Sequence, residues 1–116
     1  MDNSLPSPIL VAGCGFIGRH LCEYLLEKGI AVLGLTHSEN SAEQLRKECG
    51  FQVEALDISN LEACRQFAAQ IPTPQAIVHC ASSGRRGPEA YEQVYFGGAQ
   101  NLTTAFPLAT LLFTSS

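Results

Sequence analysis

Three glycines near the start of the chain have a spacing that could hold phosphate. Gly13, Gly15 and Gly18 follow the apolar run Ile9–Ala12 in the pattern G-x-G-x-x-G. If the run is a buried strand and a helix begins at Phe16, the glycines form the tight turn that lays a dinucleotide pyrophosphate on the helix N-terminus. Gly13 then allows the turn, Gly15 lets the phosphates approach the backbone, and Gly18 lets the helix pack closely on the strand. The pattern also arises by chance, so its meaning depends on the elements around it.

Cys14 stands inside this turn, at the N-terminus of the expected helix, where a thiolate is stabilised. It is either a redox-active thiol or a small residue that fills the turn, and we favour the second interpretation. The other cysteines are scattered singly, without C-x-x-C or Cys/His ligand spacing, so we expect buried, reduced thiols and no metal site. They are Cys22, Cys49, Cys64 and Cys80.

Strand and helix patterns alternate along the rest of the sequence. Apolar runs predict strands at residues 9–12, 30–35, 51–56, 75–81 and 109–113. Helical spacing and end signals predict helices at residues 16–28, 42–49, 61–70 and 89–106, the second beginning with a capping box of Ser41 and Gln44. Right-handed crossovers then give a doubly wound parallel α/β sheet, Rossmann-like, in the strand order 3-2-1-4-5. We expect one such domain at residues 9–116, after a flexible Pro-rich tail at residues 1–8.

The loop after the second strand is expected to contact the ribose of a dinucleotide, because the ligand lies at the switch point between strands one and four. An acidic residue there selects NAD, and its absence makes room for the 2′-phosphate of NADP. The chain has Thr36, His37 and Ser38, which favours NADP with the two hydroxyls as neutral donors and His37 as a partial cation. A merely solvated His37 is an open alternative, and Glu39 could restore a preference for NAD.

Charge and composition exclude some classes of binding partner. The 116 residues carry a net charge of -4 without a basic cluster, which argues against nucleic acid and acidic membranes. The adjacent pair Arg85 and Arg86 is interpreted as part of a solvated loop. No apolar stretch reaches membrane-spanning length, and the N-terminus lacks the features of a signal peptide. We therefore expect a cytoplasmic protein.

Four segments, in this order and spacing, resemble the N-terminal half of an extended or atypical short-chain dehydrogenase/reductase of the NAD-dependent epimerase/dehydratase type. They are the glycine turn at residues 13–18, Leu56-Asp57-Ile58, the stretch at residues 77–82, and the stretch at residues 94–102. The resemblance extends over residues 9–116. The chain departs from the family pattern at Ala12, where a further glycine is usual, and at Tyr95, where a structural asparagine is usual.

The resemblance implies a set of cofactor-binding residues in addition to those of the ribose loop. The turn contributes Gly13, Cys14, Gly15, Phe16, Ile17 and Gly18. Asp57 and Ile58 are expected to contact the adenine, and the segment after the fourth strand is expected to lie along the cofactor through Cys80, Ala81 and Ser82.

The resemblance also places the family's catalytic Ser/Thr at Ser116, the last residue of the sequence. The Tyr-x-x-x-Lys that supplies the acid/base is expected beyond it. Tyr24 and Lys28 have that spacing, but Lys28 is roughly 15 Å from Gly18 along the helix axis, so we expect no catalytic role for them. The chain alone is then expected to bind cofactor without turnover, and a small-molecule substrate requires a C-terminal half.

The fifth strand is expected to be an exposed edge with apolar residues at 111–113. Such an edge predicts a homo-oligomer or a fragment of a longer protein.

Two functional classes stay open. The first is the cofactor-binding part of an oxidoreductase or nucleotide-sugar epimerase/dehydratase, in which hydride moves between NADP(H) and a carbinol carbon and Ser116 holds the oxygen. The second is a non-catalytic nucleotide-sensing module like those that regulate potassium transporters. Those modules have a similar Gly-Cys-Gly turn but usually keep an acidic residue where this chain has Thr36.

Overall fold

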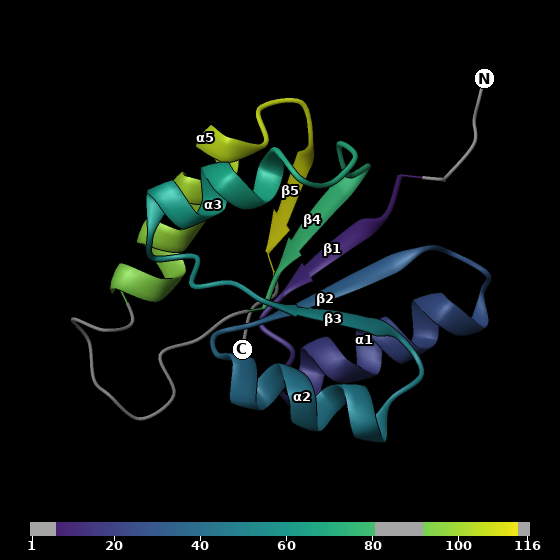
Figure 1. Cartoon of the computed structure of the whole chain (residues 1–116). Coiled ribbons are helices and arrows are strands. Elements are labelled where there is room, and N and C mark those ends of the chain that lie inside the picture. Colours follow the sequence, from purple (N-terminus) through teal and green to yellow (C-terminus); the bar gives the residue numbers. More distant parts are fainter. Residues whose placement is uncertain (1–6, 81–91, 114–116) are drawn as a thin grey trace.

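The computed structural model describes residues 7–80 and 92–113 of the chain. It contains one sheet of five parallel strands in the order β3-β2-β1-β4-β5, which confirms the predicted fold (Figure 1). The strands are β1 (Ile9–Ala12), β2 (Val32–Thr36), β3 (Gln52–Ala55), β4 (Ala76–His79) and β5 (Thr110–Phe113). Because the strands are parallel, the ends of β1, β2, β3 and β4 that carry the candidate residues all open on the same edge of the sheet.

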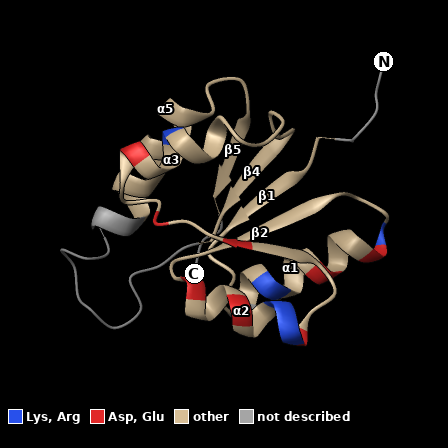
Figure 2. Cartoon of the chain, viewed as in Figure 1, with Lys and Arg blue, Asp and Glu red and all other residues tan. Residues whose placement is uncertain are grey.

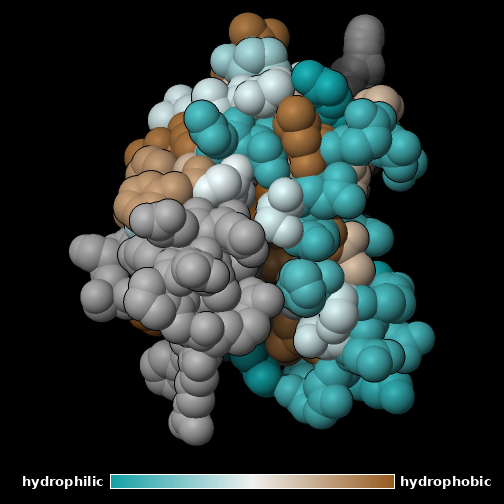
Figure 3. Space-filling model, turned by 90° about the vertical axis from the view of Figure 1, so that its left-hand side faces the viewer, coloured by the Kyte–Doolittle hydropathy of each residue, from teal (hydrophilic) through white to brown (hydrophobic). Residues whose placement is uncertain are grey.

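Helices cover both faces of the sheet (Figure 1). One layer holds α1 (Phe16–Glu27) and α2 (Glu39–Glu48), and the other holds α3 (Leu61–Ala68) and α5 (Gly98–Ala105). Basic and acidic residues lie together along α1 and α2 (Figure 2), and they include the ion pairs Arg19–Glu48 and Arg46–Glu39. The lower right of the face drawn in Figure 3, on the side of α2, is correspondingly hydrophilic.

Each helix layer encloses its own apolar core. Successive side chains of a strand point to opposite faces, so Leu10 of β1 packs in the core under α3 and α5 while Val11 packs in the core under α1 and α2. Both side chains are fully buried. The continuous apolar sequence of the central strands is the direct consequence of burial on both faces.

The start of α2 corrects one prediction. The helix begins at Glu39, not at residue 42, and Ser38 is its N-cap in extended conformation. Ser38 Oγ accepts a hydrogen bond from Ser41 N at 3.3 Å, so Ser41 lies inside the first turn. Gln44 donates to Glu48 Oε2 instead of completing a capping box. Two serines three residues apart are both competent caps, and the one nearer the strand is used.

The predicted long helix at residues 89–106 is not uniform in its described part. Residues 92–97 form the π-helical segment η1 (Glu92–Gly97), which continues into α5. Tyr95 O accepts a hydrogen bond from Nε2 of the buried His79 at 2.8 Å, a partner from outside the helix that suits a widened turn. Residues 89–91 lie outside the described part of the chain.

The first described residues and the last strand lie at the periphery of the sheet. Most of the predicted tail lies outside the described residues, but Ser7 O and Pro8 O accept hydrogen bonds from Gln75. At the far edge of the sheet, Leu112 and Phe113 of β5 are about half exposed, as expected for an edge strand, whereas Leu111 is partly buried and packs against the core under α3 and α5. Within residues 7–80 and 92–113, no helix has the length and apolar character needed to cross a bilayer.

Candidate functional site

The glycine turn joins β1 to α1 in the way its spacing predicts. Gly13 has a φ of 93°, a conformation that glycine adopts without strain. The backbone amides of Gly13 and Cys14 both donate to Leu35 O, at 2.9 and 3.1 Å. A Cβ added to Gly18 would lie 2.2 Å from Gly13 O, so the helix packs against the turn at backbone distance. Sequence and structure therefore agree on the shape of the turn.

The N-terminus of α1 is unlike the N-termini of α2 and α3. Its N-cap is Gly15, which has no side chain to cap the helix, and its first turn contains no acidic residue. In contrast, Ser38 caps α2 and Asn60 caps α3, and each of these helices has a glutamate in its first turn. Apart from the two residues that flank Gly15 in the chain, no heavy atom of the described residues lies within 4 Å of a Cβ built on it. An open helix N-terminus without negative charge fits a phosphate group.

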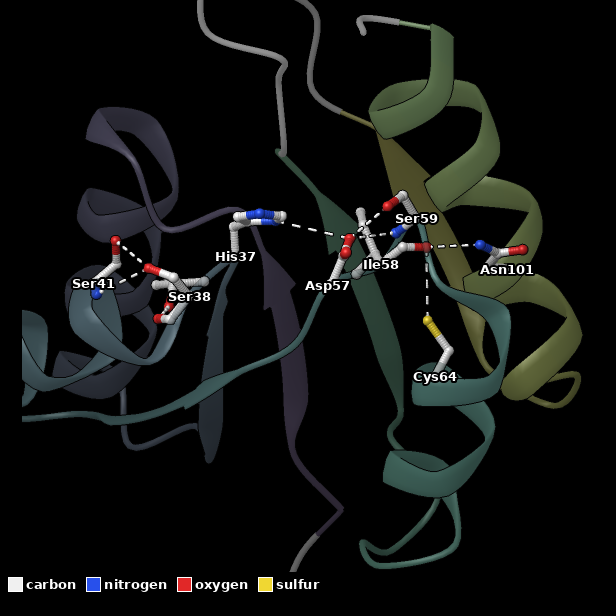
Figure 4. A network of polar contacts seen from close by, with 9 residues as sticks. His37, Ser38, Ser41, Asp57, Ile58, Ser59, Cys64 and Asn101 are labelled. Atoms are coloured by element: carbon white, nitrogen blue, oxygen red, sulfur yellow. Dashed lines mark hydrogen bonds and ion pairs between the residues drawn. The ribbon is translucent and has the colours of Figure 1, made fainter.

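The loop after β2 holds the three ribose-loop candidates in different environments. Thr36 is buried at 6% exposure, and its hydroxyl donates to Ser38 O at 3.0 Å. Ser38 Oγ is engaged with Ser41. The His37 ring is exposed, and its Nδ1 lies 3.7 Å from Asp57 Oδ1 (Figure 4). To donate a hydrogen bond to a phosphate, the Thr36 hydroxyl would therefore have to give up its hydrogen bond to Ser38 O.

The segment after β3 is fixed by side chains from distant elements (Figure 4). Asp57 Oδ1 accepts a hydrogen bond from Ser59 N at 3.0 Å. Ile58 O accepts one from Asn101 Nδ2 of α5 at 2.8 Å and another from the thiol of Cys64 at 3.7 Å. The Ile58 side chain also fills the space that Gly98 leaves open. The roles of Gly98 and Asn101 were missed at the level of sequence, although their three-residue spacing on one helix face was the available signal.

The end of β4 lies beside the glycine turn, since Cys80 N donates to Ala12 O at 2.7 Å. The buried His79 ring stacks on Tyr95 at 4.8 Å between centroids and lies 5.8 Å from Phe113. The strand order thus brings the glycine turn and the end of β4 side by side, as predicted, and the Asp57 segment follows β3 at the same edge of the sheet.

The family is decided by a match along almost the whole sequence. The family model described as NAD dependent epimerase/dehydratase family matches residues 9–116. The chain belongs to the NAD-dependent epimerase/dehydratase family. A search of curated proteins finds no significant match.

Solved structures of reductases and related enzymes share the fold of this epimerase/dehydratase family member. Gre2 of Candida albicans in complex with NADPH has a TM-score of 0.76 and 21% identity, covering 96% of this chain and 37% of its own. The yeast methylglyoxal/isovaleraldehyde reductase Gre2 with NADPH has a TM-score of 0.73 and 23% identity, covering 94% and 37%. WbmH of Bordetella bronchiseptica with NAD+ has a TM-score of 0.66 and 25% identity, covering 85% and 34%. The chain therefore spans 34% to 37% of the length of these enzymes.

Some predicted site residues of this family member lie outside the described part of the chain: Ala81, Ser82, Ser116 and the side chain of Phe16. Ile17 is described and is 48% exposed beside the open helix N-terminus. The Tyr24 and Lys28 pair lies at the other end of α1, with Lys28 Nζ 5.4 Å from the centre of the Tyr24 ring. Among residues 7–80 and 92–113, no cluster of three His, Cys, Asp or Glu residues could hold a metal ion.

Proposed function

We propose that this chain is the cofactor-binding part of an NAD(P)-dependent oxidoreductase or nucleotide-sugar epimerase/dehydratase. The observation that carries the proposal is the N-terminus of α1, which has no capping side chain, no first-turn acid and open space at Gly15. Membership of the family and the dinucleotides named for the NADPH and NAD+ complexes support it.

In this proposal the pyrophosphate binds the backbone amides that follow Gly15, where the helix dipole favours negative charge. Asp57 and Ile58 would contact the adenine, and Asn101 Nδ2 holds the Ile58 carbonyl in place. Cys80, Ala81 and Ser82 would contact the rest of the cofactor. When bound, the nicotinamide supplies or accepts the hydride, and Ser116 holds the oxygen of the reacting carbon.

The ribose loop favours NADP over NAD in this proposal. Position 36 offers no carboxylate to a 2′-hydroxyl, and the exposed His37 can turn toward a 2′-phosphate. Asp57 opposes the phosphate, because its carboxylate already faces the same ring. The preference therefore depends on His37 more than on Thr36 and Ser38, whose hydroxyls already donate to Ser38 O and Ser41 Oγ.

Calorimetric titration with NADPH and with NADH, on the chain with its cysteines kept reduced, tests the proposal. We expect both to bind and NADPH to bind more tightly, and we expect His37→Asp to reverse the order, since a second carboxylate repels the 2′-phosphate and accepts from the ribose hydroxyls. Equal binding of NADPH and of adenosine diphosphate would point to a nucleotide-sensing module instead. Absence of binding would overturn the proposal.

A further inference from the structure

Two thiols lie against one another directly beneath the glycine turn. Cys14 Sγ and Cys22 Sγ are 3.8 Å apart, one in the turn and the other on α1. Cys22 is fully buried and Cys14 is partly buried. The pair has room because position 34 of β2 is a glycine. A Cβ on Gly34 would lie 2.6 Å from Cys14 Sγ.

Only Cys14 of this pair borders a pocket that a small oxidant could enter. The pocket has a volume of about 430 Å³ and lies beside the first turns of α1. Its lining consists of Cys14, Gly15, Arg19, His20, Glu23 and Leu45. Cys22 therefore lies behind Cys14 as seen from the pocket.

The two thiols also differ in acidity. Contact with the Cys22 thiol lowers the pKa of Cys14 below its usual value, and a backbone hydrogen bond from Leu35 acts in the same direction against the effect of burial. The same contact, followed by burial, raises the pKa of Cys22. The accessible sulfur is thus the better nucleophile and the buried one is held as a thiol.

We propose that Cys14 and Cys22 are a redox pair that a hydroperoxide converts into a disulfide. The Cys14 thiolate attacks one oxygen of hydrogen peroxide, the O–O bond breaks, and the released hydroxide takes up a proton to leave as water. The Cys22 thiol then loses its proton and its sulfur attacks the sulfenic acid at Cys14, where the S–O bond breaks and a second water leaves. Two thiols are oxidised and one peroxide is reduced, and a dithiol reductant reverses the change.

The disulfide changes the shape of the turn. An S–S bond is about 2 Å long, so the sulfurs must approach well within their present separation. Cys14 is flanked by Gly13 and Gly15 and its amide is bonded to Leu35 O, so its movement displaces the backbone proposed to hold phosphate. Loss of NADPH binding on oxidation follows, and this consequence rests on the proposed function.

Tryptic peptide mapping of the whole chain tests the disulfide independently of any ligand. Cleavage after Arg19 and Lys28 separates the two cysteines into peptides 1–19 and 20–28, whereas Cys49 and Cys64 share peptide 48–65 and Cys80 lies in 66–85. After treatment with hydrogen peroxide and without reductant, we expect peptides 1–19 and 20–28 to be joined, with a mass two hydrogen atoms below the sum of the separate peptides. Dithiothreitol should separate them again. Unmodified peptides, an over-oxidised Cys14 without the link, or a link to another peptide would each overturn the inference.

Variants make the test specific. Cys22→Ala removes the resolving thiol, so the link must disappear and Cys14 must accumulate as the sulfenic acid, which dimedone captures. If that variant fails to fold, Cys14→Ala serves instead, and Cys22 must then remain unmodified. Cys49→Ser, on the same side of the sheet, must leave the link intact. NADPH titration before and after oxidation is read separately: if the reduced chain does not bind, the proposed function fails while the disulfide result stands.

Discussion

The glycine turn and the segment at residues 57–59 lie at the same edge of the sheet but are held in opposite ways. The turn is shaped by the absence of side chains, with Gly18 packed at backbone distance on Gly13. The Asp57 segment is shaped by side chains that arrive from elsewhere, above all Asn101 of α5. The glycines of the first arrangement lie within six positions of one another, with Leu35 O of β2 as their partner from outside the turn, whereas the second arrangement depends on the completed fold. Substitutions in the two regions should therefore differ in how much stability they cost and in which neighbouring atoms can adjust.

The largest effect is expected at the turn. In Gly18→Ala the new Cβ meets Gly13 O at 2.2 Å, and a backbone atom cannot move aside. We expect the free energy of unfolding to fall by about 3 kcal/mol or more, since overpacking against backbone is at the upper end of such costs. Urea unfolding followed by circular dichroism measures it. A change of less than about 0.5 kcal/mol would contradict the close packing.

The Asp57 segment should respond to Gly98→Ala by side-chain movement. The added Cβ would lie 2.5 Å from Ile58 Cδ1, the end of a side chain that can shift. We expect a loss of about 1 to 3 kcal/mol. In a double-mutant cycle with Ile58→Ala, which removes the clashing atoms, the two effects should not add. Additive losses would show that Gly98 and Ile58 do not interact.

Asn101→Leu should have a smaller effect, because it removes one hydrogen bond while keeping similar volume. Ile58 O loses its 2.8 Å donor and keeps the Cys64 thiol. We expect a loss of about 1 kcal/mol in stability and weaker NADPH binding through a looser Asp57 segment. Gln100→Leu, at the exposed neighbouring position, is the control and should change neither quantity. Unchanged NADPH affinity in Asn101→Leu would separate the hydrogen bond from the binding site.

The smallest effect is expected on the α1 and α2 layer and depends on pH. A hydrogen bond from Gln44, and to a smaller extent one from Arg19, lowers the pKa of Glu48 below its usual value. Its contribution to stability is therefore complete above the pKa of the unfolded chain and is lost as pH falls through the lower, folded value. Wild type should lose slightly more stability on acidification than Glu48→Gln. Glu43→Gln, which removes an equal charge from the same helix, is the control and should lose as much stability on acidification as wild type does. Identical stability profiles of all three proteins against pH would disprove the effect.

The two regions also explain what the sequence could predict. The turn was predictable because its three glycines carry their conformational requirements locally, and the alternation of apolar runs predicted the strand order. The Asn101 to Ile58 bond was not, because it joins residues 43 positions apart in sequence. The wrong cap of α2 has a third cause: Ser38 and Ser41 have the same chemistry, and only the geometry of the loop selects between them.

Gly15 provides the most direct measurement of the central claim, that the open N-terminus of α1 holds a dinucleotide phosphate. Its position has a negative φ and no described neighbour within 4 Å of an added Cβ, so Gly15→Ala should leave the free energy of unfolding unchanged within about 0.5 kcal/mol. The new methyl group would stand where the phosphate approaches. Calorimetric titration of the reduced chain should therefore show NADPH bound by wild type and markedly weakened in Gly15→Ala. Equal affinity of the two proteins, or no binding by wild type, would contradict the account.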